Sequence, residues 1–424
     1  MSVLRTTRSR AVPTLIAGTV LASLALAGCA GREPTAAPEA DGETEQCSPG
    51  FTDTEVTIGN SIALSGPAAA YGAIATTMKL YFDDINAAGG LEFADGTKRD
   101  VTIEIMDDGY DPAKTATNLR TLVEQQEVFA LAGVLGTGAA IAVADYVDEN
   151  GIPNLFTGTG TDAIESLHED RAWTTAYLPQ YGFEVKALSA YVVENFPGAK
   201  AAMIYQNDDF GESIKAAFES ELEGTGVELV ATESFETTAA TVDSQISTLA
   251  ASGADVFLNW TTGAFSTQSL KKKAELGWDA TTILSTTVAD ATVFLKPAGP
   301  GAADGAVSIA YTKDVTDLTQ AGDPGFDAWT VFAAKHPDDV KATFAPAGVG
   351  YTTAQLLEAA LVKMDGCTRE DLLDAVHSLE DVELDLSPLT VTTDEAFPYV
   401  FRTLGIQVFN GETWDLTDAT YTVD

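Results

Sequence analysis

The alternation of strand-type and helix-type segments is the feature that most restricts how this chain can fold. Short segments rich in β-branched residues are followed by helical patterns at 54–64, 99–108 and 128–134. The rhythm restarts after residue 176, with strand-type segments at 200–206, 227–235, 254–260 and 281–286. Strands that alternate with helices of this size form parallel sheets covered on both faces. The pattern predicts an α/β fold with two doubly wound parallel-sheet lobes.

The length of each run sets the expected lobe boundaries. Residues 51–175 and 176–305 are each about the size of one doubly wound domain. The remainder is mixed, with helical stretches at about 324–336, 350–364 and 368–377 and short β-type segments after them. We expect 306–378 to complete the first lobe and 379–424 to complete the second. Such a tail crosses between the lobes several times and so forms a hinge.

The N-terminal region has the features of an export signal. Three arginines, Arg5, Arg8 and Arg10, precede an apolar run that is short for a spanning helix. The run ends in Leu-Ala-Gly-Cys at 26–29, the bacterial lipobox, in which Cys29 receives the lipid. The pattern predicts a lipoprotein signal peptide over 1–28 and a flexible tether over 29–50. An ordinary signal peptide with a chance cysteine is the alternative.

Charge and cysteine content exclude several classes of partner. With 23 basic and 63 acidic residues, the formal net charge is −40, which repels nucleic acid and anionic lipid. A solubilising surface accounts for this charge, and adaptation to salt is the alternative. Besides Cys29 the cysteines are Cys47 and Cys367, which an oxidising compartment would join as a disulfide, or leave as two buried thiols. The three histidines have no metal-ligand spacing, so no metal is expected.

A glycine-rich turn lies between a strand and a helix in the segment AGVLGTGAAIAVADY, 132–146. Ile141 stands where a dinucleotide-binding turn has its third glycine, and no Lys-Ser or Lys-Thr follows, so no nucleotide cofactor is expected. Backbone N–H groups at a helix start suit one pair of negative oxygens. Such groups occur at Gly136 and Thr137, and in the next loop at Gly158, Thr159 and Thr161. These loops either form a binding site for a carboxylate or amide group, or are two tight turns capped by threonines.

Aromatic residues flank these loops, and enzyme motifs are missing. Tyr71, Tyr110, Tyr177, Phe210 and Trp260 each lie beside an expected strand end or helix start, as in a cleft that closes on an organic ligand. The sequence contains no Gly-x-Ser-x-Gly elbow, and its histidines have no Ser and Asp partners at recognisable spacing. We therefore expect a binding protein rather than an enzyme.

Four segments together resemble the branched-chain amino acid-binding family of ABC-importer solute receptors. They are VTIGNSIALSGPAAAYG, IMDDGYDPAKTATNLRTLVEQQEVFALAGVLGTGAA, IYQNDDFGESIKAAFESEL and LKKKAELGW. The resemblance implies a type I periplasmic binding protein fold, with three crossovers between lobes that close on the ligand. It also implies site roles for Tyr71 and both glycine loops in the first lobe, and for Phe210, Trp260, Thr261 and Thr262 in the second.

One loop departs from the family pattern. Amino-acid-binding members place an acidic residue there to pair with the ammonium, whereas this chain has LSTTVAD. Thr286 or Thr287 occupies the position, and Asp290 follows several residues late. Because an unpaired buried ammonium is costly, either Asp290 or another acid substitutes, or the ligand is not an α-amino acid.

The resulting prediction is a monomeric solute-binding protein, tethered through Cys29 to the outer face of the cytoplasmic membrane. It captures a small organic ligand and delivers it to an ABC permease with its ATPase subunits, without nucleic acid or a cofactor. The ligand is expected to be a branched-chain or hydrophobic amino acid, or a related aromatic or short-chain acid. A sensory receptor of the same fold and, less favoured, a secreted α/β hydrolase are the alternatives.

Overall fold

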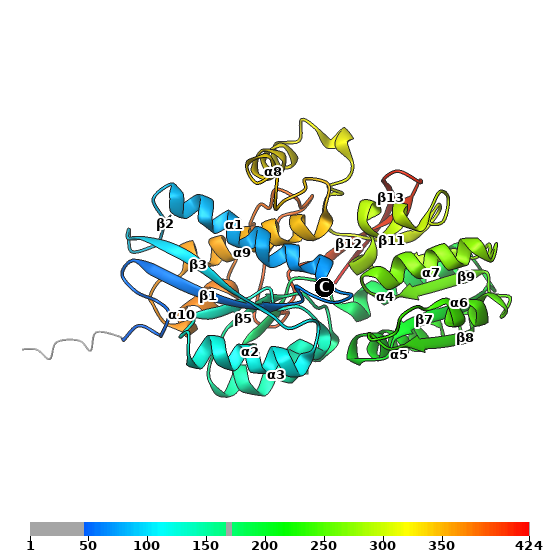
Figure 1. Ribbon diagram of the computed structural model, residues 1–424, viewed down its shortest axis with the longest axis horizontal. Coiled ribbons are helices and arrows are strands. Elements are labelled where there is room, and N and C mark those ends of the chain that lie inside the picture. The colour runs from blue at the N-terminus through cyan, green and yellow to red at the C-terminus, as the bar shows by residue number, and fades with distance from the viewer. Residues whose placement is uncertain (1–45, 167–171, 424) are drawn as a thin grey trace, which may run out of the picture. The chain divides into compact units, whose positions relative to one another are not determined.

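The computed structural model describes residues 46–166 and 172–423 (Figure 1). The predicted signal peptide, the lipid-acceptor Cys29 and most of the predicted tether lie outside the described residues. Within them, no helix combines the length and hydropathy needed to cross a membrane.

The first sheet is built from residues 55–176. Its strand order is β2-β3-β1-β4-β5-β6, and every neighbouring pair is parallel except the antiparallel pair β2–β3. Strands β1, β4, β5 and β6 are buried on both faces, as a parallel sheet between helices requires, whereas β3 nearer the edge alternates between buried and exposed residues. The strands are β1 (Glu55–Ile62), β2 (Leu91–Glu92), β3 (Lys98–Asp107), β4 (Ala130–Ala132), β5 (Asn154–Thr157) and β6 (Thr174–Ala176).

The second sheet combines the middle of the chain with its C-terminus. Its order is β13-β12-β11-β10-β9-β7-β8, parallel from β11 to β8 and antiparallel for the hairpin β12–β13 and its pairing with β11. The strands are β7 (Lys200–Gln206), β8 (Glu228–Phe235), β9 (Val256–Trp260), β10 (Thr281–Leu284), β11 (Val307–Ala310), β12 (Thr403–Phe409) and β13 (Trp414–Thr422). The α/β class with two sheets of mainly parallel strands is confirmed.

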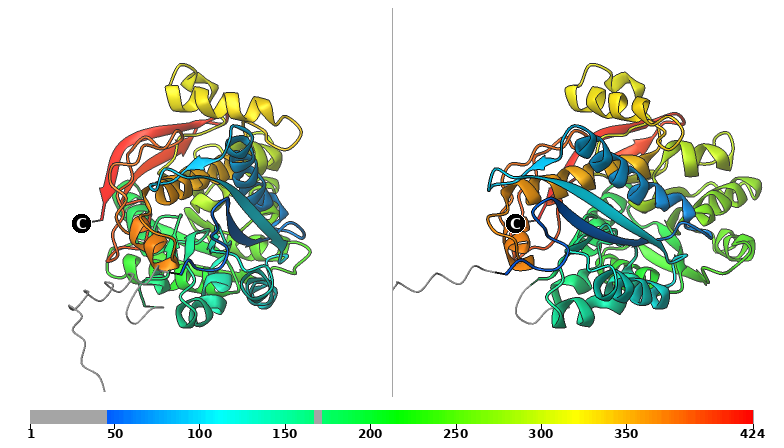
Figure 2. Two further views of the ribbon diagram at one scale, coloured as in Figure 1. Left: turned by 90° about the vertical axis from the view of Figure 1, so that its left-hand side faces the viewer. Right: turned by 60° about the vertical axis from the view of Figure 1, so that its left-hand side comes forward.

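Helices cover the sheets, and their ends follow the local sequence. Asp111 caps α2 by accepting the Ala113 N–H, with Pro112 in the first turn, as the Asp-Pro pair predicts. Figure 2 shows α1 beside α9, which contacts it closely along the first lobe. The helices are α1 (Ala73–Ala87), α2 (Pro112–Glu124), α3 (Thr137–Glu149), α4 (Tyr181–Asn195), α5 (Asp209–Leu222), α6 (Asp243–Ala250), α7 (Ala264–Glu275), α8 (Pro324–Lys335), α9 (Ala345–Lys363) and α10 (Arg369–Val376).

Short helical turns lie between these elements. They are η1 (Ala69–Gly72), η2 (Asp162–Ser166), η3 (Thr286–Val288), η4 (Ala291–Leu295), η5 (Lys296–Ala298) and η6 (Leu318–Gln320). Three of them contribute residues to the cavity between the lobes: η1 in the first lobe, and η3 and η4 in the second.

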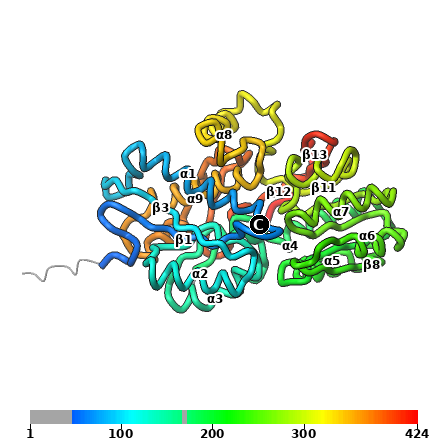
Figure 3. The backbone as a smooth tube through the Cα atoms, in the orientation of Figure 1, coloured from blue at the N-terminus to red at the C-terminus, as the bar shows by residue number. Residues whose placement is uncertain are grey.

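The chain passes between the two sheets three times. It leaves the first sheet after β6 and enters α4, returns after β11 toward α8, α9 and α10, and crosses again from α10 to β12. Figure 3 follows these passages along the tube. The predicted three-crossover connection is therefore confirmed.

Three local predictions differ from the structure. Val307–Ala310 pairs in the second sheet, although 306–378 was expected to complete the first lobe; only the helical part of that segment packs there. Helix α9 begins at Ala345 rather than near residue 350, because Pro346 starts the helix in its first turn. Residues 389–393 form no strand and make only an isolated bridge between Val382 and Val391.

A disulfide joins Cys47 to Cys367, as predicted. The same region is reinforced by main-chain contacts, since the Ser48 N–H donates to the Cys367 carbonyl. The Arg369 guanidinium donates to the carbonyls of Val128 and Phe129, at 2.8 Å each. These contacts fasten the start of the described chain to the first lobe.

Candidate ligand-binding site

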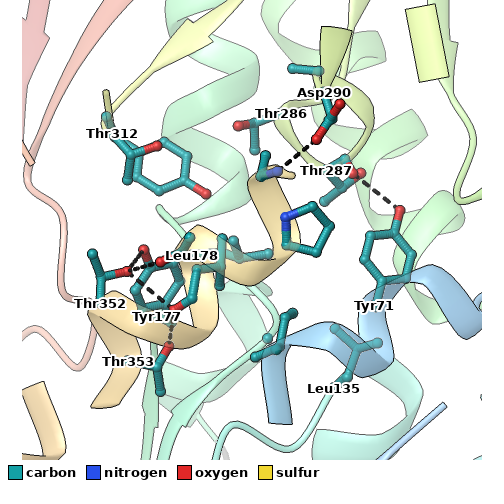
Figure 4. Close-up of a pocket in the computed structure, with 18 of the residues that line it drawn as sticks. Tyr71, Leu135, Tyr177, Leu178, Thr286, Thr287, Asp290, Thr312, Thr352 and Thr353 are labelled. Carbon is teal, nitrogen blue, oxygen red and sulfur yellow. Dashed lines mark hydrogen bonds between the residues drawn. The ribbon is translucent and has the colours of Figure 1, made fainter. Parts of the chain in front are cut away.

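A cavity of about 150 Å³ lies between the lobes. Loops at the carboxyl ends of β4 and β5 line it, together with residues from all three crossings and from the start of α9. Figure 4 shows Tyr71 and Leu135 on one side and Thr312, Tyr177 and Thr352 on the other. Cavities of this size in proteins admit molecules such as benzene, so the space suits a small organic solute.

The first glycine loop meets the cavity with main-chain groups. Gly136 has a positive φ of 110°, and an added Cβ would lie 3.2 Å from the Tyr110 ring. Helix α3 starts at Thr137, and no side chain caps this end. Gly136 and Thr137 both line the cavity, so N–H groups of the first helical turn are available to an anion there.

The second glycine loop supports the first more than it lines the cavity. Gly158 is a lining residue, but Thr159 and Thr161 are not among them. The Thr159 hydroxyl lies 2.8 Å from that of Thr137 and accepts the Thr161 N–H. The Thr161 carbonyl accepts the Tyr399 hydroxyl. Thr159 and Thr161, predicted as direct ligand contacts, are thus buried positioning groups behind Thr137.

Tyr71 bridges the lobes across the cavity. Its hydroxyl donates to the Thr287 carbonyl and accepts the Gly263 N–H, both at 3.1 Å and both from the second lobe. Burial raises the pKa of Tyr71 to about 12, so the hydroxyl remains protonated and can donate. The close approach depends on Gly263, since an added Cβ would lie 2.4 Å from the Pro67 carbonyl.

Two further predicted aromatic residues line the cavity. Phe210, in the first turn of α5, packs against the Tyr181 ring with centroids 5.3 Å apart. Tyr177 follows β6, and its hydroxyl lies 2.6 Å from that of Thr352 on α9. The first crossing is therefore tied to the helix that returns from the second lobe.

Trp260 and Thr261 lie away from the cavity, contrary to their predicted position. Trp260 is fully buried against Phe218, with ring centroids 4.7 Å apart. The strand continues through Trp260, so the two-residue period places its side chain on the same face as Leu258, against α5. Thr261 donates to the Asn259 side chain, and the neighbouring Thr262 lines the cavity instead.

The loop after β10, which departs from the family pattern, presents Thr286, Thr287 and Asp290 to the cavity. The Asp290 carboxylate caps η4 by accepting the Thr292 and Val293 N–H groups and the Thr292 hydroxyl. Its other oxygen accepts the Ala345 N–H at the start of α9, at 2.6 Å. Burial raises the pKa of Asp290, while these donors oppose the shift. Asp290 thus has a structural role that links the loop to α9.

Glu184 is a buried acid that sequence reasoning did not single out. One carboxylate oxygen accepts the Thr286 N–H at 2.9 Å, while the other has no hydrogen-bond partner among the described residues. Burial raises the pKa of Glu184 to about 7, and the Thr286 bond opposes that rise. Glu184 itself is not among the cavity-lining residues.

Two of the four described non-glycine residues with positive φ lie at this site. Tyr110 and Phe156 have φ values of 67° and 51°, a region that bulky residues rarely adopt, and both line the cavity. Strained conformations persist where the surroundings impose them, which is common in ligand sites.

Several lining residues could not be anticipated from the sequence. They come from the crossings and from α9, where no motif marks them: Tyr181, Tyr311, Val315, Pro346, Val349, Thr352 and Leu386. The only signal was the mixed pattern after residue 306, which predicted crossings without identifying which side chains they present.

Comparison with known proteins identifies the family. A family model described as periplasmic binding protein matches residues 55–401. "Leu/Ile/Val-binding protein homolog 3" of Brucella melitensis is 27% identical over 175 residues, which are 41% of this chain and 45% of that relative. "Leu/Ile/Val-binding protein homolog 7" of Brucella abortus is 21% identical over 336 residues, which are 77% of this chain and 82% of the relative.

Solved structures share the fold. A branched-chain amino acid ABC transporter protein from Thermus thermophilus with bound valine has a TM-score of 0.76 at 15% identity, covering 87% of this chain and 97% of that one. A fatty acid ABC transporter substrate-binding protein from Thermomonospora curvata has a TM-score of 0.72 at 19% identity, covering 89% and 95%. These relatives and neighbours are named for binding or transport, and none of them is named as an enzyme.

Proposed function

The chain belongs to the periplasmic binding protein family, and on that premise we propose that it captures a small carboxylate- or amide-containing organic solute between its two lobes. The family places the protein outside the cytoplasm. The relatives named for leucine, isoleucine and valine, and the neighbours named for valine and for fatty acid, support an apolar organic ligand.

One observation carries the proposal: a cavity between the lobes, crossed by the Tyr71 hydrogen bonds. The uncapped start of α3 supplies donors for a carboxylate or amide oxygen. Phe210 and the tyrosines supply apolar contact. Closure is favoured because the ligand contacts both lobes at once only when they meet.

Delivery to an ABC permease with its ATPase subunits is the second part of the proposal. It is supported by the neighbours named as ABC transporter proteins. The lipobox ending in Cys29 supports attachment to the outer face of the membrane. We also propose that the protein acts as a monomer. Partition of the full-length protein into detergent should be lost in Cys29→Ala, and equal partition of both forms would rule out the anchor.

Binding is tested by a thermal-shift screen over amino acids, amides, aromatic acids and short fatty acids, followed by solution scattering. A bound solute should raise the melting temperature and reduce the radius of gyration. Tyr71→Phe should weaken binding about two- to tenfold, because it removes the hydroxyl that joins the lobes. Tyr191→Phe is the matched control, since Tyr191 does not line the cavity. A solute that binds tightly without affecting melting or compaction would refute the closure mechanism.

A further inference from the structure

Each of the three crossings contributes one aromatic ring to a buried cluster, which we call the crossing triad. Tyr177 follows β6 in the first crossing, Tyr311 follows β11 in the second, and Phe401 precedes β12 in the third. The ring centroids of Tyr311 and Phe401 are 4.7 Å apart, and those of Tyr177 lie 5.4 Å from Phe401 and 6.3 Å from Tyr311. All three side chains are buried, so each ring packs against the other two.

Tyr177 is held by elements of the first lobe. Its N–H donates to the Thr157 carbonyl at the end of β5, at 2.9 Å. Its hydroxyl lies 2.6 Å from the Thr352 hydroxyl on α9, as Figure 4 shows. The main chain and the far end of the ring are thus both fixed to the first lobe.

Phe401 lies between a residue bonded to the first sheet and a residue bonded beside the second. The Val400 N–H donates to the Ala176 carbonyl of β6, at 3.0 Å. The Arg402 carbonyl accepts the Val423 N–H, just after β13, at 2.9 Å. A rotation of one sheet relative to the other must therefore change main-chain dihedrals at or beside Phe401.

Tyr311 occupies the equivalent place in the second crossing. Ala310, directly before it, pairs with Gly405 in the second sheet. Lys313, two residues after it, donates its N–H to the Leu386 carbonyl at 2.8 Å. Leu386 packs in the apolar cluster of α8 and α9, and α9 packs against α1 of the first lobe. The same rotation therefore moves the main chain at Tyr311.

The triad can pack in this way only over a limited range of angles between the lobes. Tyr177 moves with the first lobe, whereas Tyr311 and Phe401 lie where the chain must bend. Ring pairs are favourable at centroid distances of about 4.5–7 Å, and the attraction falls away when the rings separate. The packed triad occurs together with the two hydrogen bonds by which Tyr71 joins the lobes. Its contacts therefore stabilise this joined arrangement.

The triad also reaches the cavity. Tyr177 and Tyr311 line it, whereas Phe401 packs against both rings without being a lining residue. A solute in the cavity contacts two of the three rings. Contact with the solute and packing within the triad therefore favour the same angle between the lobes.

We propose that the crossing triad regulates the affinity of the cavity by stabilising the joined arrangement of the lobes, with Phe401 as a positioning residue that acts through Tyr177 and Tyr311. The packing of the rings sets the fraction of the protein that is ready to bind, and the apparent affinity scales with that fraction. This inference rests on the proposed solute-binding function and specifies how that site is regulated.

Hydrogen exchange of the full-length protein, without added solute, tests the triad directly. The Gly263 N–H is protected by the Tyr71 hydroxyl only while the lobes are joined. Its exchange should be at least about fivefold faster in Phe401→Ala, because two ring contacts of the joined arrangement are lost. The matched control is Phe129→Ala, which removes the same atoms from a fully buried ring in the first lobe and should change this exchange less than about twofold. Unchanged exchange in folded Phe401→Ala, or equal acceleration in both variants, would overturn the proposal.

Calorimetry with leucine, 4-methylpentanoate and 3-phenylpropanoate tests the link to affinity. Phe401→Ala should weaken the binding of every probe that binds the wild type by one common factor of about five or more, because only the competent fraction changes. A changed order of preference among the probes would show that Phe401 shapes the cavity itself, against the proposal.

Phe401→Leu keeps an apolar side chain and should recover part of the affinity and of the Gly263 protection. It also keeps both experiments decisive if the alanine variant does not fold, since it should shift both values in the same direction by less. If no solute of the thermal-shift screen binds the wild type, the proposed function fails, whereas hydrogen exchange still decides whether the triad holds the lobes together.

Discussion

The glycine loop of the first lobe presents main-chain N–H groups at the cavity, whereas the second lobe presents both an aromatic side chain and main-chain groups on short turns. In the first lobe, the start of α3 at Thr137 provides N–H groups, and the buried Thr159 hydroxyl contacts that of Thr137. In the second lobe, Phe210 contributes its ring, and η3 contributes Thr287, whose carbonyl accepts Tyr71. Main-chain donors recognise a carboxylate whatever chain it carries, whereas side chains select the rest of the ligand. Under the proposed function, we expect the first lobe to bind the head group of the ligand and the second lobe to control closure and specificity.

In the second lobe, one substitution should lower stability without affecting ligand binding, and another should weaken ligand binding. Trp260→Ala should lower the free energy of unfolding by about 3–5 kcal/mol, because it empties a buried site against Phe218. Ligand affinity of the folded variant should stay within twofold. Phe210→Ala, at the cavity, should instead weaken binding by tenfold or more. Denaturant unfolding measures the stability of each variant, and calorimetry measures its ligand affinity. A large affinity loss in Trp260→Ala would contradict the assignment of this residue to the core.

Removal of the disulfide should destabilise the first lobe more than the second. Replacing both Cys47 and Cys367 with serine should lower the free energy of unfolding by about 2–5 kcal/mol, since the bond closes a separation of 320 residues. Amide exchange should accelerate around 46–56 and 364–377, whereas β7, β8 and β9 should keep their protection. Intact mass should fall by two hydrogens on oxidation of the reduced wild type. Uniform loss of protection in both lobes would show that the lobes unfold as one unit.

Glu184 should make the second lobe sensitive to pH. Because burial raises its pKa from an ordinary 4.5 to about 7, the folded state holds a proton that the unfolded state releases. Its contribution to stability is therefore fully present below pH 4.5 and is lost as the pH rises to 7, by roughly 3 kcal/mol. Glu184→Gln keeps an acceptor for the Thr286 N–H and should remove this decline. Unfolding measured from pH 4 to 8 in both proteins checks the sign; parallel curves would mean that Glu184 titrates normally.

The smallest effect compares two threonines. Thr137→Ala should weaken ligand binding by up to about tenfold, because Thr137 lines the cavity and its position depends on the hydroxyl contact with Thr159. Thr261→Ala should change affinity less than twofold, since Thr261 bonds Asn259 away from the cavity. Isothermal calorimetry resolves both values. Equal losses of ligand affinity in the two variants would contradict the assignment of Thr137, but not Thr261, to the cavity.

The sequence anticipated the glycine loops better than the loop after β9, for a physical reason. Glycines with positive φ mark where the chain must turn, so the loop holding Gly133 and Gly136 could be placed at the end of β4 from local pattern alone. The predicted strand over 254–260 included Trp260, but nothing local shows which face of the strand its ring occupies or what covers that face. A single residue of strand length decides which face a side chain occupies.

Local pattern by itself determined the α/β class, the two lobes and the helix start at Asp111, because periodicity and capping residues act over short distances. The even number of remaining cysteines favoured a Cys47–Cys367 disulfide but left two buried thiols open, and the tertiary structure decided for the bond. Only the tertiary structure decided which side chains share the cavity. Tyr71 meets Thr287 and Gly263, and Asp290 meets Ala345, across separations of 55 to 216 residues. Such contacts depend on how the crossings bring the lobes together, and that packing is a property of the whole chain that no short segment encodes.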